Sequence, residues 1–196
     1  MKEGAPEVAL GERDALVVID LQAGFDDPIW GNRNNPSCEA NVAALVGEWR
    51  RTGRPVVFVR HDSRVAGSPL APGATGNAFK PELAGEPDLL VEKSVHSAFY
   101  GRPDLDDWLQ LRGVSGLVIA GITTDHCCET TARMAGDLGY RVLFALDATC
   151  TFDRRLPSGE PVPADDVARV TAAVLHDEFC QVVTTARLLE ASAQVA

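Results

Sequence analysis

Short apolar runs divide the chain at regular intervals and predict its strands. Five of them are continuous and rich in β-branched residues, and a weaker sixth run lies between the second and the third. Apolar residues that follow one another without polar alternation are typical of strands buried on both faces of a parallel sheet. The predicted strands are 15–19, 55–59, 117–120, 141–146 and 180–184, with the weaker one at 88–92.

Helical patterns fill the segments between these runs. Ser37 is a suitable N-cap for the first predicted helix, and Gly53, Gly113 and Gly139 each follow a helix where a left-handed C-cap residue belongs. The predicted helices are 37–52, 103–112, 125–138, 164–177 and 186–193. Because strands and helices alternate, we expect a single α/β domain over residues 1–196. The domain would have three layers, with helices on both faces of a central parallel sheet, and its folded core would span about residues 14–188.

The carboxyl ends of the predicted strands carry the reactive side chains. Ligands of an open parallel sheet bind beyond these ends. Asp20, Lys93 and the segment 121–128 all lie there, so an acid, a base and a thiol are expected to converge. The segment 63–83 contains three Gly, three Pro and little periodicity, which predicts a long loop at the active site.

The net charge of the chain excludes two classes of partner. The chain has 18 Lys and Arg against 28 Asp and Glu, a net charge of −10. Nucleic acids and anionic membranes are bound through basic patches, so neither is expected as a partner.

No apolar run is long enough for a transmembrane helix, and residues 1–6 lack the apolar segment of a secretory signal. The five cysteines form no C-x-x-C pair, which favours a reduced, cytoplasmic protein with buried thiols.

Cys127 is the candidate nucleophile. The chain passes from a buried strand through Gly121 and polar capping residues into a helix, which places Cys127 in the first helical turn. Backbone N–H groups and the helix dipole stabilise a thiolate at that position, although a buried structural cysteine fits the pattern as well. Asp20 ends a buried strand and Lys93 follows the weak one, and alone they also fit a capping aspartate and an exposed lysine. Together the three supply a nucleophile, an acceptor for its proton and a cation that holds this base.

Several separate motifs resemble the isochorismatase-like cysteine hydrolases, the superfamily that includes the nicotinamidases. In chain order the motifs are 16–22 with Phe25, Lys93 with 97–99, 121–132, and 138–140 with 147–148. The resemblance implies a catalytic triad of Asp20, Lys93 and Cys127, and a cis peptide between Ile122 and Thr123. The backbone N–H groups of Thr123 and Cys127 are then the candidates for an oxyanion hole.

Departures from the superfamily patterns narrow the expected chemistry. Nicotinamidases place an aspartate and a histidine for a metal just after the second strand, where this chain has His61 in the first position. Neither a metal nor another cofactor is therefore expected. Isochorismatases that act on a vinyl ether can lack the cysteine, so Cys127 favours hydrolysis of an amide C–N bond through a thioester.

The loop 63–83 and the segment 127–133 are similar to the branch that contains streptothricin hydrolase. This similarity implies a cyclic amide substrate such as the streptothricin lactam. Two alternatives stay open. One is another small amide, of nicotinamide, ureido or maleamate type, and the other is an idle member that only binds a ligand.

Histidines and aromatic residues near the strand ends are the candidates for the substrate pocket, although each also fits a structural histidine or a core aromatic. Cys128 is interpreted as a packing residue, and Cys150 as a core thiol or a residue at the pocket edge. The expected partners are a small-molecule amide and further copies of the chain, in a dimer or tetramer. The pocket candidates are Phe25, His61, His96, Phe99, Tyr100, His126 and Phe152. Trp30 is a further aromatic residue that could wall the substrate.

Overall fold

A six-stranded sheet, with every strand parallel to its neighbours, forms the centre of the molecule. The computed structural model describes residues 7–195, so residues 1–6, where no secretory signal is predicted, lie outside the described part. The strand order is β3-β2-β1-β4-β5-β8. The strands are β1 (Ala15–Ile19), β2 (Val56–His61), β3 (Leu89–Lys93), β4 (Gly116–Ile122), β5 (Arg141–Cys150) and β8 (Gln181–Val183).

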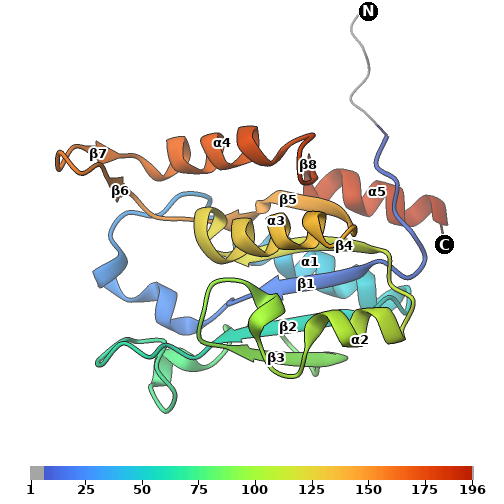
Figure 1. Ribbon diagram of the computed structural model, residues 1–196, viewed down its shortest axis with the longest axis horizontal. Coiled ribbons are helices and arrows are strands. Elements are labelled where there is room, and N and C mark those ends of the chain that lie inside the picture. Colours follow the sequence, from blue (N-terminus) through green and yellow to red (C-terminus); the bar gives the residue numbers. More distant parts are fainter. Residues whose placement is uncertain (1–6, 196) are drawn as a thin grey trace, which may run out of the picture.

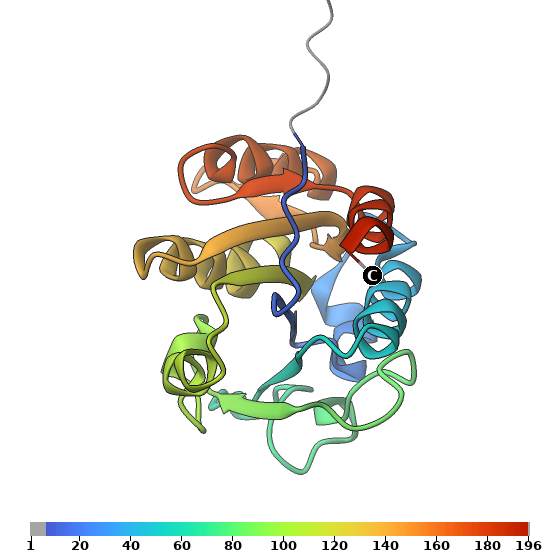
Figure 2. The same cartoon turned by 90° about the vertical axis from the view of Figure 1, so that its right-hand side faces the viewer.

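Helices cover both faces of this sheet, as Figures 1 and 2 show. The buried apolar residues of α1 and α5 belong to the core on one face, and those of α2 and α3, with Leu175 of α4, belong to the core on the other face. These three layers confirm the expected α/β architecture with a central parallel sheet. The helices are α1 (Cys38–Arg51), α2 (Leu105–Leu111), α3 (Glu129–Asp137), α4 (Ala164–Leu175) and α5 (Thr185–Val195).

The central strand β1 explains the continuous apolar pattern of the sequence. All five of its residues are 0% exposed. Leu16 and Val18 pack into the core beneath α1 and α5, whereas Ala15, Val17 and Ile19 pack into the core beneath α2, α3 and α4. Because successive side chains of a strand point to opposite faces, a strand with helices on both sides needs apolar residues at every position.

The structure differs from the sequence prediction in a few local features. The strand β5 continues to Cys150, four residues beyond the predicted end, and pairs with β4 through a register shift between Ile119 and Gly121. The helix predicted from residue 125 begins instead as a π-helical turn, η5 (Thr124–Cys128), which leads into α3. None of the described helices is long and apolar enough to cross a membrane.

Several short elements that the periodicity does not predict connect the main ones. A two-stranded hairpin of β6 and β7 lies between β5 and α4 (Figure 1). Brief 3-10 turns interrupt the loops after β1, β2 and β3. These elements are β6 (Arg154–Arg155), β7 (Pro161–Val162), η1 (Ala23–Asp26), η2 (Pro28–Trp30), η3 (Thr75–Asn77) and η4 (Ala98–Tyr100).

Candidate active site

The three predicted catalytic side chains meet at the carboxyl end of the sheet. Asp20 follows β1, Lys93 is the last residue of β3, and Cys127 lies in the turn after β4. The ammonium Nζ of Lys93 donates to Asp20 Oδ2 at 2.6 Å, and both side chains are 0% exposed. A carboxylate oxygen of Asp20 and the Cys127 Sγ lie within 4.8 Å of each other. The sheet therefore brings an acid, a cation and a thiol together from three separate strands.

Unusual backbone conformations place Asp20 and Cys127 next to each other. Asp20 has a φ of 51°, a left-handed conformation that few non-glycine residues adopt. Gly121 has a φ of 126°, and a Cβ atom there would lie 2.0 Å from the carbonyl oxygen of Ile19. Only glycine fits this close approach of β4 to β1. The peptide between Ile122 and Thr123 is cis, as the family resemblance implies.

Cys127 itself lies in the π-helical turn that precedes α3. The Cys128 N–H donates to the Thr123 carbonyl at 3.1 Å, which spans five residues and widens the turn around Cys127. Cys127 keeps 7% of its surface exposed, whereas Cys128 and Cys150 are fully buried in the core. The interpretation of Cys128 as a packing residue therefore agrees with its position, and Cys150 is a core thiol.

The protonation states at the site are set by burial and by the ion pair. Burial raises the pKa of the Cys127 thiol well above its usual range, and the Asp20 carboxylate raises it further, while Lys93 opposes both effects. Burial disfavours the charge of Lys93, but Asp20 outweighs this and raises the lysine pKa. The sequence predicts a thiolate stabilised by the helix N-terminus, but the raised pKa favours a thiol. The resting side chain is therefore a thiol beside a carboxylate–ammonium pair. The helix dipole is outweighed because the sulfur lies in an interior of low polarity.

Three histidines surround the thiol. His96 Nδ1 lies 3.7 Å from Cys127 Sγ, and His61 Nδ1 lies 3.4 Å from Lys93 Nζ. The ring of His126 lies 5.6 Å from that of His96. Burial lowers the pKa of both His61 and His126, and Lys93 adds to this effect at His61. These two rings are thus neutral near pH 7 and can donate and accept hydrogen bonds.

A cavity of about 140 Å³ opens onto the thiol; we call it the Cys127 cavity. Cavities of about 150 Å³ hold a benzene ring, so this space suits a six-membered ring or a short acyl chain. A more open hollow of about 570 Å³ between α4 and β8 contains none of the predicted catalytic residues. The Cys127 cavity is lined by Asp20, Phe25, Trp30, His61, Leu70, His96, Thr123, His126, Cys127 and Arg154.

Four of the seven predicted pocket residues line this cavity, namely Phe25, His61, His96 and His126. The other three, Phe99, Tyr100 and Phe152, are not among the lining residues, so the prediction is corrected for them. Phe99 is 9% exposed and stacks on Tyr140, with ring centroids 6.1 Å apart, in the core beneath α2 and α3. Tyr100 is 70% exposed.

Phe152 lies behind the cavity wall and is 2% exposed. Its ring centroid is 6.2 Å from that of Phe25 and 5.9 Å from that of Trp30. Proximity to a strand end places an aromatic residue near the site, but the direction of the side chain decides whether it lines the cavity or supports its wall.

Sequence reasoning missed two lining residues, Leu70 and Arg154, whereas Trp30 is an aromatic residue that the sequence offers as a possible pocket wall. Trp30 donates from its indole Nε1 to the Gly24 carbonyl at 2.8 Å, which fixes the ring against Phe25. Arg154 reaches the cavity from β6, and its guanidinium Nε donates to Asp125 Oδ2 at 2.7 Å. None of these residues belongs to a periodic pattern, so the sequence carries no signal for them beyond their residue types.

The fully buried side chain of Gln22 connects the long loop to the sheet. Its Oε1 accepts from the His61 N–H at 2.8 Å, and its Nε2 donates to the carbonyls of His61 and Asn77 at 3.1 and 2.9 Å. Asn77 donates in turn to the Leu70 carbonyl at 2.9 Å. These bonds hold the segment 63–83 over the carboxyl end of β2 and place Leu70 in the cavity wall.

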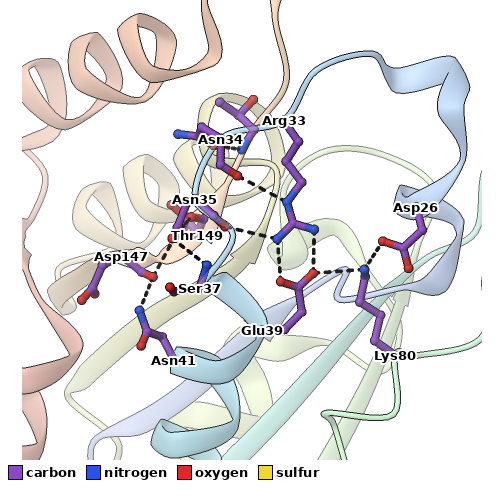
Figure 3. A network of polar contacts seen from close by, with 11 residues as sticks. Asp26, Arg33, Asn34, Asn35, Ser37, Glu39, Asn41, Lys80, Asp147 and Thr149 are labelled. Carbon is purple, nitrogen blue, oxygen red and sulfur yellow. Dashed lines mark hydrogen bonds and ion pairs between the residues drawn. The ribbon is translucent and has the colours of Figure 1, made fainter.

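A polar network around Arg33, Glu39 and Lys80 holds the segment that follows β1 (Figure 3). Arg33 binds Glu39 of α1 through two hydrogen bonds of 2.7 and 2.5 Å, and Lys80 from the long loop pairs with Glu39 at 3.0 Å and with Asp26. Burial alone would raise the pKa of the Glu39 carboxyl, but the bonds from Arg33 and Lys80 lower it to about 2. Glu39 thus joins the segment after β1 to α1 and to the long loop.

The metal site that the superfamily suggests does not fit this chain. Asp62, the acid after β2, accepts from Arg60 at 3.1 Å and from Asn77 at 3.0 Å, so its Oδ1 already has partners. Among residues 7–195, the only cluster of three or more His, Cys, Asp or Glu donors is Asp20, His61 and Cys127. A metal there would occupy the predicted nucleophile and the predicted base.

Comparison with known proteins identifies the family. The model of the isochorismatase domain matches residues 14–160. This chain belongs to the isochorismatase family. The isochorismatase family protein YrdC of Bacillus subtilis is 35% identical over 179 residues, which cover 91% of this chain and 95% of YrdC. A solved structure of an isochorismatase-family protein from Chromobacterium violaceum has a TM-score of 0.92 and 38% identity, and covers 98% of this chain and 100% of that chain. The expected enzyme class, a hydrolase of this family, is thereby confirmed.

Relatives with named activities differ in their substrates. Nicotinamidase 3 of Arabidopsis thaliana is 35% identical over 156 residues, which cover 72% of this chain and 75% of that protein. Streptothricin hydrolase of Streptomyces noursei is 31% identical over 170 residues, which cover 84% of this chain and 66% of that protein. These values do not place the chain in the streptothricin hydrolase branch, so that part of the resemblance stays a prediction.

Proposed function

We propose that this protein hydrolyses the C–N bond of a small amide through a thioester on Cys127. The observation that carries the proposal is the convergence of a slightly exposed thiol, a buried carboxylate and a buried ammonium at the Cys127 cavity. An idle, ligand-binding member would not need a buried ion pair beside its thiol, because burying two charges is costly unless the geometry is used or fully compensated.

In the first step the Cys127 Sγ attacks the amide carbonyl carbon. Asp20 accepts the thiol proton as the S–C bond forms, which agrees with a resting thiol of raised pKa. Lys93 donates to the other oxygen of Asp20, so it fixes the orientation of the carboxylate. Lys93 is thus a positioning residue for the base.

The negative charge that develops on the carbonyl oxygen needs donors within the cavity. The N–H groups of Thr123 and Cys127 are the candidates, because both belong to the turn that faces the substrate. The Thr123 Oγ1 is buried and has no hydrogen-bond partner, and Thr123 lines the cavity. A substrate oxygen or amide group would satisfy this hydroxyl.

The intermediate then collapses and the C–N bond breaks. Asp20 returns its proton to the leaving nitrogen, so ammonia or an amine departs and the acyl group stays on sulfur. A water molecule attacks the thioester, Asp20 takes one of its protons, and the thiol is regenerated as the carboxylic acid leaves. No redox step and no cofactor enter this balance.

The cavity volume favours a small substrate. A space of about 140 Å³ is close to the volume that holds a single six-membered ring, and Phe25, Trp30 and Leu70 contribute apolar walls, so the amide of a short acyl chain or of one small ring fits best. We therefore place a small primary amide first. A lactam such as that of streptothricin is the second candidate, because a net charge of −10 attracts a polycation, although this aids encounter and does not select the bond that breaks.

A panel of amides tests the proposal. Purified protein is incubated with aromatic, ureido and maleamate-type amides and with streptothricin, and release of ammonia and product mass are measured. We expect ammonia from at least one small amide, none with Cys127→Ala, and a covalent acyl adduct on Cys127 when the reaction is quenched in acid. Lactam opening would instead add the mass of one water without release of ammonia. Turnover by Cys127→Ala close to that of the wild type would exclude the thioester route.

A further inference from the structure

The cluster of Asp20, His61 and Cys127 has a donor set that suits a thiophilic metal ion. A carboxylate oxygen, an imidazole nitrogen and the thiol sulfur all lie within 4.8 Å of one another. Oxygen, nitrogen and sulfur ligands in a compact group are what Zn²⁺ takes in proteins, usually with a fourth ligand in a tetrahedral arrangement. His96 Nδ1 lies 3.7 Å from Cys127 Sγ but outside this cluster, so a water molecule or an anion is expected in the fourth place.

A second observation also points to a ligand at this cluster. Asp20 uses Oδ2 for its bond to Lys93, whereas Oδ1 is buried and has no hydrogen-bond partner. An unpartnered, fully buried carboxylate oxygen is costly, and a cation that binds it would remove that cost. Lys93 can keep its own bond to Oδ2 while Oδ1 binds the metal, so the ion pair need not break.

We propose that Zn²⁺ binds reversibly to Asp20, His61 and Cys127 and thereby inhibits the enzyme. Binding breaks the Cys127 S–H bond, releases that proton to solvent and forms a sulfur–zinc bond, with no change in oxidation state. The inhibitory part rests on the proposed function, because a metal on Sγ and Oδ1 removes both the nucleophile and the proton acceptor. The site therefore differs in kind from a cofactor site, in which the metal leaves the nucleophile free.

The charge balance allows such binding. Before the metal binds, Lys93 neutralises Asp20 and the thiol is uncharged. After binding, Zn²⁺ brings two positive charges and the thiolate one negative charge, so the buried site gains a single positive charge. His61 supplies a nitrogen donor to the cluster, and an anion or water that enters through the cavity can complete the shell.

The first measurement is of binding, so it does not depend on turnover. The chelator-dialysed wild-type protein is titrated with Zn²⁺ in competition with a chromophoric chelator, and separately with Co²⁺ as a spectroscopic substitute. We expect one Zn²⁺ per chain, with a Kd in the micromolar range or tighter, and thiolate-to-cobalt charge-transfer absorption. The charge-transfer band should be absent from Cys127→Ala.

Two histidine variants make a matched pair within the same cavity. His61→Gln removes a ligand and should weaken Zn²⁺ binding by at least about tenfold. His126→Gln changes a histidine that lines the same cavity but lies outside the cluster, and its Zn²⁺ affinity should equal that of the wild type. Circular dichroism and thermal unfolding establish that both variants fold.

The outcomes separate this inference from the proposed function. Zn²⁺ that binds through His61 and Cys127 in a protein that hydrolyses no amide would uphold the site and remove only the function. A wild-type protein that hydrolyses an amide, yet shows no charge-transfer band and no inhibition by Zn²⁺, would overturn the inference alone. Equal Zn²⁺ affinities of His61→Gln and the wild type would overturn it as well.

Discussion

Replacing Lys93 by methionine should destabilise the fold far more than loss of an ordinary lysine does. The side chains of Lys93 and Asp20 are both 0% exposed, and Nζ lies 2.6 Å from Oδ2. At an effective dielectric constant of about 20, charges at this distance attract by about 6 kcal/mol, most of which offsets their desolvation. Lys93→Met leaves an unpaired buried carboxylate, which costs about 3–5 kcal/mol.

This cost is measurable as a change in thermal stability. In a chain of this size, about 1 kcal/mol lowers Tm by about 2–4 °C, so Lys93→Met should lower Tm by about 6–20 °C. The double variant Asp20→Asn/Lys93→Met carries no buried charge at this position and should be more stable than Lys93→Met alone. Both variants should lack activity.

Lys80→Met is the matched control. Lys80 is also a buried lysine, but its partner Asp26 is exposed and its partner Glu39 keeps two bonds from Arg33 when Lys80 is lost. Its Tm should fall less than that of Lys93→Met, and its activity should persist. If the double variant is less stable than Lys93→Met, or if Lys93→Met unfolds within 2 °C of the wild type (about 1 kcal/mol or less), the reasoning about an unpaired carboxylate is wrong.

Three further outcomes are expected. Glu39→Gln should lower the unfolding free energy by about 1.5–3 kcal/mol at pH 7, because bonds to a charged partner are lost. Since the Glu39 pKa is lowered from 4.5 to about 2 in the folded state, this contribution is present above pH 4.5 and should disappear as the pH of a denaturation series falls toward 2. Iodoacetamide should label Cys127 slowly at pH 6 and faster as the pH rises to 9, because the thiol pKa is raised; fast labelling at pH 6 would contradict this. Dialysis against a chelator should leave amide hydrolysis unchanged or increase it, whereas loss of activity that Zn²⁺ restores would show a required metal.

The sequence predicts the parts of this protein that depend on periodicity and on chain order. Apolar runs such as 15–19 locate the strands because burial on both faces leaves no choice of residue type, and strand ends locate Asp20 and Lys93. The sequence does not predict in which direction a side chain points or how deeply it is buried. Phe152 and Phe25 are both aromatic residues near the site, yet only Phe25 lines the cavity, because the rest of the fold determines which way each ring points.

The protonation state of Cys127 could not be predicted from the sequence for a related reason. A helix N-terminus favours a thiolate, but the extent of burial and the adjacent carboxylate depend on how tightly three strands pack, which no local pattern records. The position of Arg154 in the cavity wall could not be predicted for the same reason. It belongs to a two-residue strand whose position is set by its bonds to Asp125, a residue in another element.

The strand order sets the distance over which the ion pair must reach. Lys93 is on β3 and Asp20 follows β1, and β2 lies between them. Neighbouring strands are about 4.8 Å apart, so the two backbones are separated by about twice that distance, and only a long cation bridges it. Asp20, in contrast, follows the strand that directly adjoins β4, the strand before Cys127. The partners are therefore not interchangeable: the exchange Asp20→Lys with Lys93→Asp would retain two opposite charges but move the carboxylate away from the thiol. A protein that retained this pair in reverse would have kept its ion pair and lost its base.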